Sequence, residues 1–84
     1  MDDRRISSRQ RVDERASIAV DEHTSIPCLI FDLSREGLRV VAPEVQAVPR
    51  VFLLSAHRFS EAQVCQVVWR KGEEIGARFR TPLG

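Results

Sequence analysis

Arginines crowd the first fifteen residues of the chain. Between residues 4 and 15 there are five of them and only two acidic residues: Arg4, Arg5, Arg9, Arg11 and Arg15 against Asp13 and Glu14. The planar guanidinium of arginine binds phosphate through paired hydrogen bonds, pairs with the edge of guanine and stacks on a base face. The point charge of lysine performs these roles poorly. This short basic segment therefore predicts an anionic partner.

A second group of polar residues lies in the segment DLSREG, residues 32 to 37, between two apolar runs. Asp32 can accept hydrogen bonds from the N1–H and N2–H₂ edge of a guanine, and Ser34 can donate or accept beside it. Gly37 lets a backbone approach where a Cβ would collide. The same three residue types are also ordinary turn formers, because Asp and Ser bond nearby backbone and Gly tolerates positive φ. Both interpretations are open at this point, and for Gly37 they are compatible.

The elements that must position these residues are short strands, because apolar residues recur with a period of two. Six strands are expected, over residues 16–20, 26–34, 38–43, 50–56, 62–70 and 75–80. Pro43 and Pro49 bracket a loop, and Gly72 supplies the turn of the last hairpin. Six strands without a convincing helix predict an all-β fold, a small six-stranded antiparallel β-barrel whose strands close on themselves.

The length of 84 residues allows only one hydrophobic core. We expect a flexible arginine-rich arm over residues 1–15, the barrel over residues 16–80 and a tail over residues 81–84. No stretch approaches the roughly 18 consecutive apolar residues of a membrane span. The first residues lead into no apolar segment typical of a signal peptide. The sequence therefore favours a cytoplasmic protein without a membrane span.

Several other residues have side chains that could bind a metal, form a disulfide or stack on a base, but simpler structural roles explain them. Cys28 and Cys65 match no zinc-binding pattern and are expected to be small buried hydrophobic residues rather than a disulfide. His23 and His57 are assigned to loop surfaces, and Trp69 to the core. No nucleophile motif, phosphate-binding glycine loop or metal cluster is present. We therefore expect no enzyme activity, no metal and no cofactor.

The order of three motifs resembles a known family. RISSR (Arg5 to Arg9), DLSREG (Asp32 to Gly37) and the closing VWRKGEEIGARF are similar to the motifs of the PilZ domain, a six-stranded barrel family whose members bind cyclic di-GMP. The resemblance implies that this nucleotide is the ligand. The ligand-binding residues that it implies are Arg4, Arg5, Arg9, Asp32, Ser34 and Gly37.

Two segments of the chain match the RxxxR motif. RVDER, from Arg11 to Arg15, also fits, but Arg15 abuts the strand expected from Ala16, whereas family members keep several residues between the second arginine and the strand. Arg5 and Arg9 are therefore preferred. By the same resemblance, an arginine at the preceding position, Arg4, favours a stacked dimer of the nucleotide.

These observations predict a non-enzymatic cyclic di-GMP receptor whose arm changes conformation on binding and signals to an unidentified downstream protein. Many family members carry a helix after the barrel, whereas this chain ends five residues past Phe79, which puts helix-mediated partner contacts or dimerisation in doubt. One alternative is a protein-interaction adaptor that does not bind nucleotide. Another is a small nucleic-acid-binding barrel that uses the arginines for phosphates, although few aromatic residues are present for base stacking.

Overall fold

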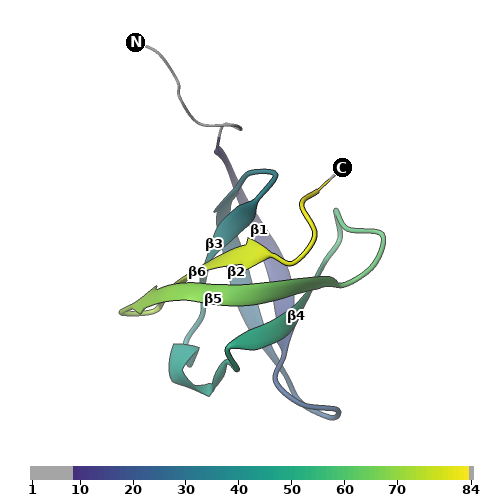
Figure 1. Ribbon diagram of the computed structural model, residues 1–84. Coiled ribbons are helices and arrows are strands. Elements are labelled where there is room, and N and C mark those ends of the chain that lie inside the picture. The colour runs from purple at the N-terminus through teal and green to yellow at the C-terminus, as the bar shows by residue number, and fades with distance from the viewer. Residues whose placement is uncertain (1–8, 84) are drawn as a thin grey trace.

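Six antiparallel strands close into a barrel in the computed structural model, which describes residues 9–83 (Figure 1). The strands are β1 (Gln10–Ala19), β2 (Ser25–Leu33), β3 (Gly37–Val41), β4 (Val51–Ala56), β5 (Gln63–Lys71) and β6 (Glu74–Phe79). Neighbours run in the order β1-β2-β3-β6-β5-β4, and β4 pairs back onto β1. A single 3₁₀ turn, η1 (Val45–Ala47), lies between β3 and β4. The predicted fold class is confirmed.

The first strand begins earlier than the alternation of apolar residues predicts. β1 starts at Gln10 rather than Ala16, so residues 10–15, which the sequence assigns to the arm, belong to a strand, and Gln10, Arg11, Glu14 and Arg15 pair with β2. A register shift between Arg11 and Glu14 marks a bulge, and Asp13 within it has a φ of +48°. An extra residue interrupts the period of two, and this hides the strand from a search for alternation. Arg9 therefore lies directly before β1, at the edge of the barrel.

Buried and exposed side chains alternate along the strands, most clearly in β4, and the buried ones fill the core. Phe52 and Leu54 are 3% and 0% exposed, whereas Val51 and Leu53 are 40% and 44% exposed. Closure brings the inward residues of all six strands into one cluster. Its fully buried members include Ile18, Ile30, Leu38, Val40, Leu54 and Ile75.

The two cysteines are buried and unpaired, as predicted. Burial raises the pKa of the Cys28 thiol to about 12. Burial, with a smaller effect of the Cys28 thiol, raises the pKa of Cys65 to about 12 as well. Both side chains therefore serve as small apolar residues of the core.

The loops carry the two histidines. His23 follows β1 and His57 follows β4, and both are exposed, which confirms their predicted surface positions. Within residues 9–83 no helix is long and apolar enough to cross a membrane.

Candidate functional site

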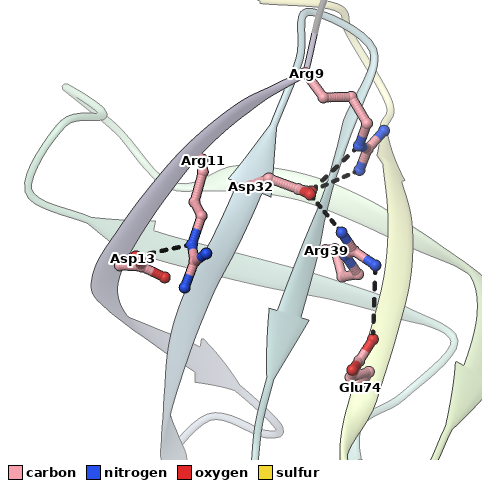
Figure 2. Close-up of polar contacts among 6 residues, drawn as sticks. All are labelled: Arg9, Arg11, Asp13, Asp32, Arg39 and Glu74. Carbon is pink, nitrogen blue, oxygen red and sulfur yellow. Dashed lines mark hydrogen bonds and ion pairs between the residues drawn. The ribbon is translucent and has the colours of Figure 1, made fainter.

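Asp32, near the end of β2, accepts hydrogen bonds from two arginines (Figure 2). Its Oδ1 accepts from Arg9 Nη2 at 2.9 Å and from Arg9 Nε at 3.2 Å. Its Oδ2 accepts from Arg39 Nη2 at 2.7 Å. The residue is only 6% exposed. Each carboxylate oxygen therefore has a cationic partner, as a buried charge requires.

The strand pairing explains why these three side chains meet. In the β1–β2 ladder Asp32 lies opposite Arg11, two residues after Arg9, and in the β2–β3 ladder it lies opposite Arg39. A register shift between Ile30 and Asp32 skips Phe31 and sets this pairing. Side chains directly opposite each other across a ladder are close enough to interact, as are long side chains at the diagonal positions two residues away, where Arg9 lies relative to Asp32. The bulge in β2 thus puts one carboxylate between arginines from both neighbouring segments.

The electrostatics of Asp32 follow from its surroundings. Burial alone would raise the pKa of its carboxyl, but the hydrogen bonds from Arg39 and Arg9, with the charges of both guanidinium groups, outweigh it and hold the pKa below the ordinary value. The folded state thus favours the ionised form more than the unfolded chain does.

A pH dependence of stability follows. The ordinary pKa of aspartate is about 3.9, so the stabilisation from Asp32 is complete well above that value and is lost as the pH falls through the lowered pKa of the folded state. Urea unfolding at a series of pH values between 7 and 2.5 should show a smaller loss of unfolding free energy in Asp32→Asn than in the wild type. Equal acid dependence of the two proteins would contradict the coupling of Asp32 to the arginines.

Arg39 makes further contacts that fix its side chain on the outside of the barrel. Its Cζ lies 4.7 Å from the centroid of the Phe31 ring, and its Nη1 lies 4.0 Å from Glu74 Oε1. On β1, the Cζ of Arg11 lies 4.5 Å from the same ring. Among residues 9–83 no hydrogen-bond partner reaches the buried Nε of Arg39. Arg39 therefore combines an ion pair, a cation–π contact and an unsatisfied donor.

A hollow of about 520 Å³ lies beside this cluster. Arg9, Arg39 and Arg78 line it with Ser34, Gly37 and Trp69, among others. Three guanidinium groups and an indole ring around one hollow offer both cations for phosphate and a flat apolar face for a base.

Trp69 lies outside the core, so the expectation from sequence is wrong. The residue is 41% exposed, and its indole occupies the space that a side chain at Gly76 would fill, since a Cβ there would lie 2.2 Å from the indole Nε1. A register shift between Val67 and Trp69 in the β5–β6 ladder interrupts the alternation, so Trp69 lies on the outer face. With Arg39 it also lines a second hollow of about 640 Å³. Trp69 and Arg39 thus border two adjoining hollows.

The family model described as the PilZ domain matches residues 3–84, essentially the whole chain. The chain is a PilZ domain. This confirms the resemblance drawn from its motifs. The family consists of non-enzymatic receptors and is known for binding cyclic di-GMP, which agrees with the expectation that the chain is not an enzyme. No curated protein matches the sequence.

The PilZ motifs meet in space as far as the structure describes them. Arg9, the second arginine of RxxxR, contacts Asp32, the first residue of DLSREG, across 23 positions of sequence. Arg9 also lines the hollow of about 520 Å³ with Ser34 and Gly37. Arg4 and Arg5, which are also predicted to bind the nucleotide, lie outside the residues that the structure describes.

Ser34 and Gly37 also have structural roles in the turn between β2 and β3. Ser34 Oγ accepts a hydrogen bond from the Glu36 amide at 3.3 Å, and the Ser34 amide donates to the Gly37 carbonyl at 2.8 Å. A Cβ at Gly37 would lie 2.3 Å from the backbone oxygen of Ala77. The turn interpretation therefore holds for Ser34. Gly37 is not a positive-φ residue of the turn but the first residue of β3, where the close approach of the Ala77 backbone leaves no room for a side chain. Both roles are compatible with the position of these residues beside the hollow.

Arg39, Trp69 and Arg78 line the hollow but are not among the ligand-binding residues predicted from sequence. A signal for Arg39 is present in the sequence, because it is a charged residue between Leu38 and Val40, two buried strand residues, five positions after Ser34. The sequence gives no comparable signal for Trp69, because its outward position depends on the register shift in the β5–β6 ladder.

Proposed function

We propose that this PilZ domain binds cyclic di-GMP in the hollow bordered by Arg9, Arg39 and Trp69. The observation that carries the proposal is the contact between Arg9 of RxxxR and Asp32 of DLSREG at 2.9 Å, beside a hollow that is rich in arginine. Two motifs far apart in sequence thus present their side chains to one volume.

The chemistry of the ligand fits this set of groups. Cyclic di-GMP has two phosphates and two guanines, so its receptor needs cations for the former and hydrogen-bonding or stacking partners for the latter. Arg9 and Arg39 each have guanidinium donors beyond those that Asp32 accepts, and Trp69 offers a ring face for a guanine. The Asp32 carboxylate is nearly buried and lines neither hollow, so its proposed role is to hold Arg9 and Arg39 in place for the nucleotide.

The arm supplies the rest of the proposed site. Arg5, with Arg4 before it, would close over the nucleotide from the segment preceding β1, and Arg4 would favour a stacked dimer of the ligand. Ordering this segment costs conformational entropy, which the charge-assisted bonds to phosphate offset. The ordered arm then presents a changed surface to a downstream protein.

An isothermal titration with cyclic di-GMP, GTP and a short oligonucleotide tests the proposal. We expect binding of cyclic di-GMP alone. Arg5→Ala should raise its dissociation constant by about tenfold or more, because each hydrogen bond to a charged group is worth about 1.5–3 kcal/mol. Arg15→Ala should bind nearly as the wild type does.

Three other outcomes of these titrations would favour an alternative function or a different RxxxR match. Tight binding of the oligonucleotide would favour the nucleic-acid-binding alternative, and no binding of any ligand would favour the adaptor. Loss of binding in Arg15→Ala but not in Arg5→Ala would move the RxxxR motif to Arg11 and Arg15.

A further inference from the structure

Three large apolar side chains are exposed together on the outer face of β4 and β5. Val51, Leu53 and Val64 are 40%, 44% and 39% exposed. Leu53 lies directly opposite Val64 in the β4–β5 ladder, so the two side chains are neighbours on one face. The core does not require them, because the inward positions of β4 are held by Phe52 and Leu54.

A groove of about 340 Å³ runs along this apolar face. It arises because the β1–β4 ladder ends at the pair Ala19 and Leu53, while β4 begins two residues earlier, at Val51. Beyond Ala19 the chain turns through residues 20–24, and Pro49, two residues before β4, also lines the groove. We call this feature the β4 groove. None of its lining residues also lines the hollow proposed for the nucleotide.

The rim of the β4 groove carries charge of one sign. Asp21 and Glu22 line it, and among residues 9–83 neither an arginine nor a lysine does so. The Glu22 side chain is 92% exposed. The groove therefore combines an apolar floor with an acidic edge, a combination that fits apolar side chains next to a cation.

We propose that the β4 groove docks an extended segment of a partner protein in which large apolar residues adjoin a lysine or arginine. The apolar residues would cover Leu53 and Val64, and the cation would lie beside Glu22. Such a segment buries the exposed face and places opposite charges at the rim, where they steer association and select the partner. The proposal is independent of nucleotide binding.

A second copy of the chain fits this surface less well. Stable protein–protein interfaces bury roughly 1,200–2,000 Å² in total, whereas the apolar face here consists of three side chains beside a small groove. A symmetric contact over so small a patch would also bring Asp21 and Glu22 of both copies near each other, and like charges repel. A short basic and apolar segment avoids both difficulties.

Selection from a random peptide-display library tests the proposal even though the partner is unidentified. The immobilised wild-type protein serves for selection, and a Leu53→Glu variant removes peptides that bind elsewhere. We expect the enriched peptides to contain Leu, Ile, Val or Phe within two residues of Lys or Arg. Enrichment of acidic peptides, or no enrichment at all, would overturn the proposal.

The most enriched peptide is then titrated into the ¹⁵N-labelled protein. Amide shifts should concentrate at Leu53 and Val64, and the dissociation constant should rise at least about tenfold in Leu53→Glu, since burying an unpaired charge is costly. Glu22→Lys, a change in an exposed turn that does not threaten the fold, should weaken binding several-fold. Ser55→Glu, on the same face of β4 but outside the groove, is the matched control and should bind as the wild type does.

Two results would overturn the assignment at this stage. Unchanged affinity in both Leu53→Glu and Glu22→Lys would place the peptide elsewhere. A concentration-dependent dimer of the wild type that Leu53→Glu abolishes would show that a second copy of this chain occupies the groove.

Discussion

Arg39→Ala is expected to raise the dissociation constant for cyclic di-GMP by about tenfold to a hundredfold, although this residue lies in none of the three PilZ motifs. The substitution removes a guanidinium that lines both hollows and also releases Asp32 Oδ2 from its 2.7 Å hydrogen bond. Each lost hydrogen bond to a charged group costs about 1.5–3 kcal/mol. Isothermal titration of the variant, with a thermal melt of the empty protein, measures both effects.

The neighbouring Arg35→Ala is the matched control. Arg35 lies in the turn between β2 and β3, where its Nε donates to the Leu83 carbonyl at 3.3 Å, and it lines neither hollow. Removing it deletes the same charge but should change binding little. Arg39→Lys should not restore binding fully, because an ammonium cannot bridge Asp32 and a ligand with a planar fork. Equal affinities of Arg39→Ala and the wild type would exclude Arg39 from the site.

The alternation of apolar residues is sufficient to predict the barrel. Wherever a strand pairs regularly, as β4 does, every second side chain is buried, and the sequence shows this directly through Phe52 and Leu54. Closure of the sheet then follows from the need to satisfy strand edges. The motifs likewise bring together Arg9 and Asp32, which are in contact in the structure.

The features that sequence reasoning misses are those controlled by bulges. In β1 a bulge around Asp13 hides a strand that begins at Gln10, and in β5 an irregularity before Trp69 turns the indole outward. A bulge depends on the register against the partner strand, and a single chain segment does not contain that information. The pairing of Arg39 with Asp32 has the same origin, since it requires the shift that skips Phe31.

Asp32 illustrates how a residue type can indicate a site without fixing its contacts. The sequence leaves open whether this carboxylate bonds the turn or a guanine edge, whereas in the structure it bonds Arg9 and Arg39. A carboxylate between two arginines holds both guanidinium groups in place before a ligand arrives. Pre-organised donors of this kind lose less entropy on binding, which favours affinity.

Gly37→Ala is expected to lower the free energy of unfolding by about 1–3 kcal/mol or more, the cost of forcing extra atoms into a packed site. The added Cβ would lie 2.3 Å from the backbone oxygen of Ala77, and neither strand can withdraw without breaking the β3–β6 ladder, in which Gly37 pairs with Arg78. For a domain of this size the melting temperature should fall by roughly 5–20 °C. Thermal and urea unfolding measure this directly.

Gly72→Asn is the control for the loss of a glycine. Gly72 has a φ of +62°, and apart from its two chain neighbours no described residue has an atom within 4 Å of an added Cβ. Asparagine tolerates this conformation, so the change should cost about 1 kcal/mol or less.

Binding measured on Gly37→Ala separates the two roles of this glycine. Gly37 is the first residue of β3, the strand that contains Arg39. A methyl group that displaces β3 should therefore weaken cyclic di-GMP binding as well as lower stability. A variant that keeps wild-type stability but loses binding would instead show that the glycine is needed for close approach of the ligand, and that the Ala77 contact can relax.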